Sequence, residues 1–233
     1  MNWILGIDTS SIDLCIGLFS NEQPVASYTR MLKNSHAEHI ARAVSVLLDS
    51  NSVRAGAITH IAIAAGPGSF TGLRIGYAFV KGFCLGSAIR VMSVSSLFVL
   101  ARGACNSAAG VIAAVDARRD EIFWARFRYT ATAVVRETPD TLSPVSDFRN
   151  AIKTGDTVVT DTMGYARSTV FEFLAGRPNV FPVERYPVQR GFICASAGAS
   201  SLSDGSLWVN AGDAQPAYLR SFMPLTLSKG RVL

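Results

Sequence analysis

An internal repeat constrains the fold of this chain more than any other feature of its sequence. Residues 4–19 read ILGIDTSSIDLCIGLF, residues 112–127 read IAAVDARRDEIFWARF, and the two stretches align without a gap, so that Asp8 coincides with Asp116. Each stretch predicts a buried strand that ends in aspartate, a short polar turn and a second strand. Two copies of this unit predict two similar α/β lobes that face a cleft, with one aspartate from each lobe at its mouth.

The remaining apolar runs place one such lobe on each side of a boundary near residue 108. The expected elements are strands at 23–30 and 61–65 and helices at 36–50 and 73–88, then strands at 134–142 and 157–160 and helices at 144–154 and 165–175. The predicted domains are residues 1–108 and residues 109–233. The NSAAG segment at residues 106–110 is the expected hinge.

The repeated aspartates suggest a chemistry and also have a purely structural interpretation. Kinases built from two lobes of this kind use such carboxylates to position a metal-bound phosphate or as a base. Alternatively, an aspartate at the end of a strand accepts hydrogen bonds from the turn that follows it. The sequence leaves both interpretations of Asp8 and Asp116 open.

A glycine-rich segment, GPGSFTGLRIG at residues 66–76, joins the strand-like run IAIAA to a helix-like run. The free N–H groups and the dipole of a helix start attract anions. The segment nevertheless matches neither GxxxxGK[ST] nor GxGxxG. We therefore favour a tight strand-to-helix junction with close backbone packing over a phosphate cradle. The candidate contacts for a bound cofactor are Asp8, Gly66, Gly68 and Asp116.

The overall composition excludes several classes of protein. The chain has 22 basic and 17 acidic residues, a net charge of +5, but no basic run or alternation of basic and aromatic residues marks an RNA groove. We therefore favour an ordinary solvated surface. The cysteines form no CxxC pair, which argues against a zinc knuckle or a disulfide framework and fits a reducing cytoplasm. Residues 1–3 carry no basic segment, and Gly6 and Asp8 interrupt the apolar run that follows, so no signal peptide is expected. The sequence has no uncharged run of about 18 apolar residues, so no membrane span is expected either.

Two smaller patterns have a structural and a functional interpretation. His36 and His39 are three residues apart and could share one face of a helix, as metal ligands do. The spacing is not that of HExxH, however, and a capped helix start with Glu38 in its first turn explains the same residues. We favour the cap. Ser69 lies in GSFTG rather than in the GxSxG of a nucleophile elbow.

Several motifs resemble those of the bacterial TsaB family. They are ILGIDTSS at 4–11, His36 with Glu38, GPGSFTGLRIG at 66–76 followed by Lys81 and Gly82, VSSL at 94–97, VDARRDEIFWA at 115–125 and PAYLR at 216–220. The resemblance runs from residue 4 to residue 220. It implies a duplicated actin-like fold of the ribonuclease H-like (ASKHA) type, with mixed sheets flanked by helices.

The resemblance also implies a function. Members of this family take part in making threonylcarbamoyladenosine beside the anticodon of tRNAs that read codons beginning with A. It implies a cytoplasmic, non-catalytic partner that forms a heterodimer with TsaD, works with the ATPase TsaE, and meets tRNA through that complex. It further implies a homodimer when TsaD is missing.

Comparison with the related TsaD pattern argues against catalysis by this chain. TsaD carries VNHxEGH, whose two histidines bind a metal, and this chain has Ser96 and Leu100 at those positions. Leucine cannot bind a metal, so no metal and no cofactor are expected. The second lobe also lacks a glycine-rich turn at residues 160–164, and Asp120 stands where the family commonly has glycine. The alternatives are an ATP-dependent phosphotransferase of the sugar kinase-like fold or a glycoprotease-like metallopeptidase.

A binding role requires a surface, and the two helices of the first lobe are the candidates. The second of them is apolar on nearly all sides, so we expect its own sheet to cover one face and a partner helix the other. By the resemblance, this surface pairs with TsaD or with a second copy. The residues expected at the interface are Ile40, Val44, Leu47, Leu73, Gly76, Tyr77 and Val80, and glutamate at position 77 or 80 is expected to abolish binding while the fold stays intact.

Overall fold

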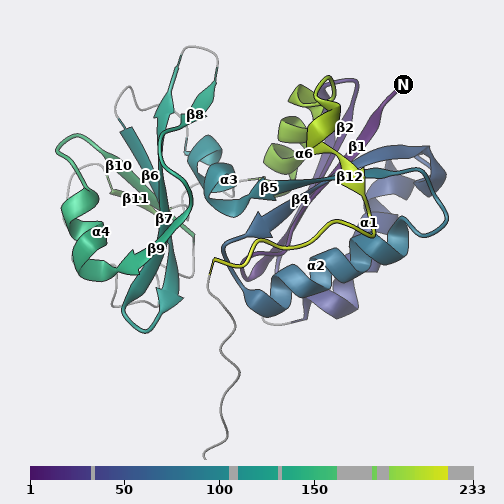
Figure 1. Cartoon of the computed structure of the whole chain (residues 1–233). Helices are drawn as coiled ribbons and strands as arrows, with labels where there is room; N and C mark the ends of the chain where they lie inside the picture. The colour runs from purple at the N-terminus through teal and green to yellow at the C-terminus, as the bar shows by residue number, and fades with distance from the viewer. Residues whose placement is uncertain (33–34, 105–109, 131–132, 162–179, 183–188, 220–233) are drawn as a thin grey trace, which may run out of the picture.

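The chain forms two α/β lobes that lie side by side (Figure 1). The computed structural model describes residues 1–32, 35–104, 110–130, 133–161, 180–182 and 189–219. In the first lobe the sheet order is β12-β5-β4-β1-β2-β3. These strands are β1 (Trp3–Asp8), β2 (Asp13–Ser20), β3 (Gln23–Met31), β4 (Ile58–Gly66), β5 (Arg90–Ser95) and β12 (Val209–Asn210).

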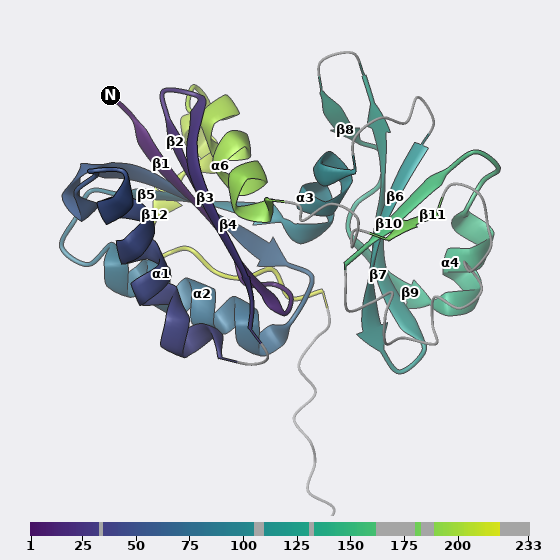
Figure 2. The same ribbon diagram turned by 180° about the vertical axis from the view of Figure 1, so that it is seen from behind.

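Helices cover both faces of this first sheet. On one face lie α1 (His36–Ser50) and α2 (Phe70–Phe83), and on the other lies α6 (Arg190–Ser200), as Figures 1 and 2 show from opposite sides. The IAIAA run of β4 is buried throughout, because both faces of the strand are covered. The largest core of the described chain lies between the sheet and the α1/α2 layer. Two single 3₁₀ turns, Ala55–Ala57 and Gly205–Leu207, complete the lobe.

The second lobe repeats this plan with shorter elements. Its sheet order is β11-β10-β6-β7-β8, and β9 also pairs with β7. The strands are β6 (Gly110–Arg118), β7 (Glu121–Tyr129), β8 (Val134–Arg136), β9 (Thr141–Pro144), β10 (Thr157–Thr160) and β11 (Val180–Pro182). On one face α4 (Val145–Ala151) inserts Phe148, and on the other α3 (Ser96–Gly103) packs Leu97 and Leu100.

The two sheets have the same topology. In each, the first hairpin is antiparallel, the next strand pairs in parallel with the first strand of that hairpin, and a further parallel strand follows: β1-β2, β4 and β5 in one lobe, and β6-β7, β10 and β11 in the other. The predicted fold class, two duplicated actin-like lobes with mixed sheets flanked by helices, is confirmed.

The two hairpins differ in register by one residue, which the ungapped alignment missed. Asp8 lies opposite Cys15, whereas Asp116 lies opposite Ile122 rather than Phe123. The turn of the second hairpin is the tighter one. Its residues Arg118, Arg119 and Asp120 have φ values of 65°, 58° and 57°, a left-handed conformation that permits a short reversal but is unfavourable for residues other than glycine.

The end of the described chain returns to the first lobe. Helix α6 packs on β1 and β2, and β12 pairs with β5. Nothing in the repeat predicts that the chain returns to the first lobe. The predicted domain boundary near residue 108 stays a prediction. The expected hinge lies, apart from Gly110, outside the described residues, and so does the helix expected at 165–175. The strand expected at 134–142 is two short strands separated by Glu137–Asp140.

The helix-like run after the glycine segment starts and ends earlier than expected. Helix α2 begins at Phe70 because Ser69 caps it, and it ends at Phe83, shortly before Gly86 with φ of 74°. Within the described parts of the chain, no helix combines the length and the apolar character needed to cross a membrane.

Candidate functional site

A cleft of about 620 Å³ lies between the two lobes. The first lobe contributes the turn after β1, the start of α1 and the first turns of α2. The second lobe contributes the end of β6, Phe123 of β7 and Asp161, which follows β10. The lining residues are Ser10, Ser11, Ile12, His36, Gly68, Ser69, Phe70, Thr71, Gly72, Ile75, Val115, Asp116, Ala117, Arg118, Phe123 and Asp161. Its position is the one that the repeat predicts.

The glycine segment brings α2 directly against the first hairpin. Ser69 N–H donates to the Ser10 carbonyl over 2.7 Å, and Ser69 Oγ accepts from Gly72 N–H over 3.1 Å. A Cβ atom at position 72 would overlap the carbonyl oxygen of Thr9, and one at position 76 would overlap the Thr9 hydroxyl. Gly66, a candidate cofactor contact, has φ of 108°, and Gly68 packs on the Ser10 backbone. Close backbone packing therefore accounts for these glycines.

Asp8 is held inside the first lobe and is not among the residues that line the cleft. It is 0% exposed, and its Oδ1 accepts from Ser10 N–H over 2.7 Å and from Ser10 Oγ over 2.6 Å. The structural interpretation of this aspartate, a cap on the following turn, is thereby confirmed. Its other oxygen, Oδ2, has a different counterpart on α6.

The ion-pair partner of Asp8 Oδ2 is Arg190 on α6. Its Nε lies 3.6 Å from Asp8 Oδ2, its Nη2 lies 3.5 Å from Asp13 Oδ2, and it donates to Ser11 Oγ. Burial by itself would lower the pKa of Arg190, but the carboxylate of Asp8 raises it, with further contributions from other groups including Asp161, and the net direction is upward. The guanidinium thus stays charged and neutralises the carboxylates behind the wall of the cleft.

Asp116 has the corresponding place in the second lobe but a different environment. Its Oδ1 accepts from Arg118 N–H over 2.7 Å, and its Oδ2 lies 3.3 Å from Arg118 Nη1. Both residues line the cleft, and the Arg118 side chain is 72% exposed. Asp116 also caps its turn, therefore, but its ion pair faces the cleft.

Asp161 and Arg190 are not among the site residues predicted from the sequence. Asp161 follows the buried strand β10, lies at the cleft and is 8% exposed, so the strand-end pattern that identified Asp8 could have identified it too. For Arg190 no local signal exists, because its contacts with Asp8 and Ser11 join residues about 180 positions apart.

The start of α1 places His36 at the cleft. His36 is 4% exposed, and within the described residues its Nε2 has no hydrogen-bond partner. The candidates for the predicted cap are Asn34, which lies outside the described residues, and Ser35, which makes no side-chain capping bond. Glu38 does lie in the first turn. Among the described residues, no group of three or more His, Cys, Asp or Glu side chains is placed to hold a metal ion.

The two positions that hold metal ligands in the TsaD pattern have structural roles. Ser96 Oγ accepts from Gly66 N–H over 3.2 Å and so fixes the glycine turn. Leu100 is 1% exposed and packs in the core between α3 and the second sheet. These contacts explain why a serine and a leucine suit this part of the chain.

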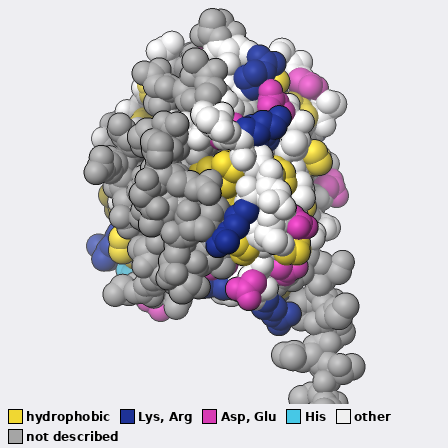
Figure 3. All heavy atoms as spheres, turned by 90° about the vertical axis from the view of Figure 1, so that its left-hand side faces the viewer, with side chains coloured by type: hydrophobic (Ala, Val, Ile, Leu, Met, Phe, Trp, Pro, Cys, Tyr) yellow, Lys and Arg dark blue, Asp and Glu magenta, His cyan; other side chains and the backbone are white. Residues whose placement is uncertain are grey.

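The densest group of basic residues consists of Arg118, Arg119, Arg126 and Arg128, and three of these four pair with acidic residues. Arg126 Nη1 lies 2.7 Å from Asp156 Oδ1, and Arg128 Nε lies 3.0 Å from Glu137 Oε1. Figure 3 shows Lys and Arg interspersed with Asp and Glu on this side of the molecule. The ordinary solvated surface favoured from the sequence fits these observations.

The seven residues predicted to contact a partner lie in the first lobe's own core. Their exposed fractions are 3% for Ile40, 2% for Val44, 6% for Leu47, 2% for Leu73, 3% for Tyr77 and 0% for Val80, and Gly76 is buried as well. Their side chains cover the sheet, because the apolar stripe of each helix turns inward. The expectation that glutamate at 77 or 80 would leave the fold intact is therefore wrong.

The outward side of α2 carries other residues, which we call the outer stripe. It consists of Phe70, Arg74, Ala78 and Lys81 on the helix and Leu85 just beyond it, all of them exposed. Their spacing of three or four residues aligns them along one face. On α1, Val46 is exposed at 48%.

Comparisons with known proteins place these features in a family. Residues 29–167, more than half of the chain, match the family model described as TsaD: tRNA N6-adenosine threonylcarbamoyltransferase. The tRNA threonylcarbamoyladenosine biosynthesis protein TsaB of Escherichia coli (strain K12) is 35% identical over 127 residues, which cover 54% of this chain and 54% of that protein. This chain thus spans about half the length of that curated relative.

Two further matches extend the similarity. The protein of the same name from Bacillus subtilis (strain 168) is 31% identical over 153 residues, which cover 66% of this chain and 67% of that protein. The solved structure of YeaZ from Pseudomonas aeruginosa superposes with a TM-score of 0.77 at 26% identity and covers 94% of this chain and 100% of that chain. The similarity to YeaZ therefore includes both lobes and their arrangement.

Proposed function

This chain belongs to the TsaB family, within the wider group that the TsaD family model describes, and we propose that it takes part in making threonylcarbamoyladenosine in tRNA. The observation that carries the proposal is the match to the Bacillus subtilis TsaB protein over 67% of that protein's length. In this role the chain is a non-catalytic partner of TsaD, which transfers the threonylcarbamoyl group to the adenosine beside the anticodon, and TsaE is the third component.

The state of Asp8 supports a role without catalysis. A phosphotransferase of this fold would need that carboxylate to face its metal-bound phosphate, but here one oxygen caps the turn and the other faces Arg190. Removing Asp8 from this arrangement would leave a buried guanidinium without one of its two carboxylate partners, which is costly. Of the two repeated aspartates, Asp116 is the one that lines the cleft.

The helix layer of the first lobe supports a role in binding. The outer stripe and the exposed Val46 present apolar side chains to solvent on neighbouring helices that already pack on each other. Exposed apolar residues gathered on one face are typical of protein interfaces. We place the heterodimer contact with TsaD on this face, and also the contact between two copies when TsaD is missing. In this proposal tRNA is reached through the complex.

Reconstitution of the modification tests the proposal. Unmodified tRNA is incubated with TsaD, TsaE, ATP and a source of threonylcarbamoyl-adenylate, with or without this chain, and threonylcarbamoyladenosine is measured by mass spectrometry of the digested tRNA. We expect product only when the chain is present. Equal product without it would refute the proposed function.

A calorimetric titration with Mg-ATP tests the phosphotransferase alternative. We expect no saturable heat from the isolated chain. Saturable binding that Asp116→Asn abolishes would favour the alternative instead, because the change leaves the turn's backbone in place and removes only the charge.

A further inference from the structure

His36 is a buried polar residue that the first lobe leaves without a partner. It is the first residue of α1, it is 4% exposed, and it lines the cleft. Among the described residues, no group forms a hydrogen bond with its Nε2 atom. A buried imidazole nitrogen normally donates or accepts a hydrogen bond, and leaving it unpaired is unfavourable. A molecule bound in the cleft can supply the missing partner.

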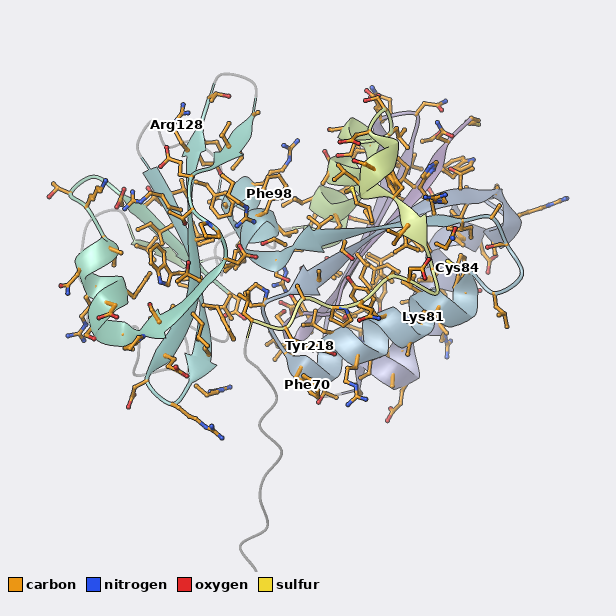
Figure 4. All side chains as sticks on the ribbon, in the orientation of Figure 1. Phe70, Lys81, Cys84, Phe98, Arg128 and Tyr218 are labelled. Carbon is orange, nitrogen blue, oxygen red and sulfur yellow. The ribbon has the colours of Figure 1, made fainter. Side chains whose placement is uncertain are left out.

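The start of α2 lines the same cleft and favours negative charge. Helix α2 has 14 residues, and the first N–H groups of a helix have no acceptor within it. Ser69 Oγ accepts from one of them, that of Gly72, and no acidic side chain lies in the first turn. The positive end of the helix dipole is therefore not offset by a carboxylate on α2 itself. Figure 4 shows Phe70 at this end of α2, on the side toward the second lobe.

The second lobe adds a cation on its side of the cleft. Arg118 lines the cleft, and its side chain is 72% exposed. Its Nη1 lies 3.3 Å from Asp116 Oδ2, an ion pair that engages part of a guanidinium with five N–H donors. Among the described residues its other side-chain donors have no partner. They remain available to a bound anion.

The carboxylates around the cleft do not cancel this positive character, because arginines neutralise them. Asp116 accepts from Arg118 N–H over 2.7 Å and pairs with its guanidinium. Asp8 faces Arg190, and the carboxylate of Asp161 contributes to the raised pKa of the same arginine. A magnesium-bound phosphate would draw on carboxylates to hold the metal. This arrangement therefore suits an anion without a metal better than a metal-bound nucleotide.

Apolar side chains form much of the remaining wall. They are those of Ile12, Phe70, Ile75, Val115, Ala117 and Phe123. A cleft of about 620 Å³ that combines apolar walls with a few polar groups has the size and character of a small-molecule site. A molecule that matches the lining has one anionic end and an apolar body.

From these observations we infer that the cleft binds a small, metal-free anion with an apolar body. Its phosphate or carboxylate group lies at the start of α2 and accepts hydrogen bonds from His36 Nε2 and from the Arg118 guanidinium, and its body packs on the apolar wall. Because His36 belongs to the first lobe and Arg118 to the second, the bound molecule joins the two lobes. The site is independent of the proposed function, since no protein partner takes part in it.

Calorimetric titration of the full-length chain with four probes, in buffer that contains EDTA, tests the inference. Phenyl phosphate and benzoate combine a ring with a phosphate or a carboxylate, inorganic phosphate lacks the ring, and phenol lacks the anion. We expect phenyl phosphate or benzoate to bind saturably, and the tighter of the two identifies the anionic group. Inorganic phosphate and phenol should bind about tenfold more weakly or less.

Three results of these titrations would contradict the inference. They are the absence of saturable binding by both phenyl phosphate and benzoate, equal binding of phenol, and, in magnesium buffer, tighter binding of Mg-ATP than of either ring-bearing anion. The last result would assign the cleft to a metal-bound nucleotide.

Substitutions locate the bound probe. His36→Phe keeps a ring and removes Nε2, and Arg118→Met removes the cation. Arg128→Met makes the same change at an exposed arginine of the second lobe that does not line the cleft and that Figure 4 shows well away from the start of α2. We expect the first two variants to weaken binding about tenfold or more and the third to leave it unchanged. Unchanged binding by the first two, or an equal loss with Arg128→Met, would refute the proposed site.

Thermal unfolding checks the fold of each variant. His36→Phe should be as stable as the wild-type chain, because the nitrogen that it removes has no hydrogen bond to lose. A large loss of stability would show that Nε2 has a partner within the protein, and the inference would then fail.

Nuclear magnetic resonance reports on His36 in the unsubstituted chain. The sequence contains three histidines, so long-range ¹H–¹⁵N spectra of the imidazole rings give few signals. His39→Gln and His60→Gln, at positions that do not line the cleft, assign them. We expect the tighter-binding probe to shift the Nε2 signal of His36 more than the ring signals of His39 and His60. An unshifted His36 signal at saturation would mean that the probe binds elsewhere and would overturn the inference.

Discussion

The first hairpins of the two lobes share one strand plan but treat their aspartates in opposite ways. Asp8 is 0% exposed and faces the buried Arg190, whereas Asp116 pairs with Arg118, whose side chain is 72% exposed at the cleft. The difference comes from α6, which packs on the first hairpin and brings Arg190 to Asp8. The two hairpins thus share one backbone plan. Helix α6, which follows both of them in the sequence, accounts for the burial of Asp8, while Asp116 stays at the cleft.

The largest expected effect is the loss of stability when the buried arginine, Arg190, is replaced, compared with replacement of the exposed Arg118. Arg190→Met leaves the Asp8 carboxylate buried without its counterion, so we expect the free energy of unfolding to fall by about 3–5 kcal/mol. Arg118→Met removes an exposed pair and should cost less than about 1 kcal/mol. Urea unfolding followed by circular dichroism measures both. Restoring part of the stability by adding Asp8→Asn to Arg190→Met would identify the unpaired charge as the cause.

Similar costs for the two arginine variants would contradict the comparison. In that case the buried pair would contribute no more than the exposed one, and the packing of α6 rather than its charge would protect the first hairpin.

The second prediction concerns the close packing of α2 on the first hairpin. Gly72→Ala places a methyl group against the Thr9 carbonyl, which must move, and we expect a loss of about 1–3 kcal/mol in the free energy of unfolding. Gly82→Ala on the same helix meets open space and should gain about 0.5–1 kcal/mol from helix propensity. The same urea titration measures both variants, and a gain from Gly72→Ala would refute the proposed close contact.

Part of the fold and part of the candidate site could be predicted from the sequence. The alternation of apolar residues in the two repeats predicted both hairpins, and the repeat predicted a cleft with Asp116 at its mouth. It could not predict that Asp8 would be closed off, because the closing arginine lies about 180 residues away and nothing in its neighbourhood marks a buried ion pair. The partner of a buried charge is a property of the assembled fold.

The helix faces were assigned wrongly for a related reason. Helix α2 is apolar on nearly all sides, so periodicity alone cannot tell the side that covers the sheet from the side that faces solvent. The strongest apolar positions, such as Tyr77 and Val80, point inward. The outer stripe could have been inferred from Arg74 and Lys81, since charged residues on an otherwise apolar helix face water.

The third prediction concerns how the stability of the first core depends on pH. Burial raises the pKa of Tyr77 in the first core to about 12. The tyrosinate is disfavoured in the folded state, so this contribution to stability is complete below pH 10 and is lost as the pH rises toward 12. We expect a loss of about 1 kcal/mol between pH 9 and pH 11 that Tyr77→Phe removes.

Urea unfolding of both proteins at several pH values checks this expectation. Cys84, whose pKa is raised to about 11 by burial, remains in both proteins, so the difference between them isolates the tyrosine. Identical pH profiles would show that Tyr77 does not titrate in this range.

The smallest expected effect returns to the two turns. Arg119 has φ of 58°, which costs a residue other than glycine about 1–2 kcal/mol, while glycine loses about 0.5–1 kcal/mol of backbone entropy. Arg119→Gly should therefore raise the midpoint of thermal unfolding by a few degrees at most, and Asp120→Gly should raise it less, because aspartate tolerates this conformation better. In the first turn, none of residues 9–12 has a positive φ, and Ser10 donates to Asp8. Ser10→Gly should therefore lower the midpoint. Changes of the same sign in both turns would mean that the second hairpin is not strained by its shorter reversal, and that the register difference between the lobes has another cause.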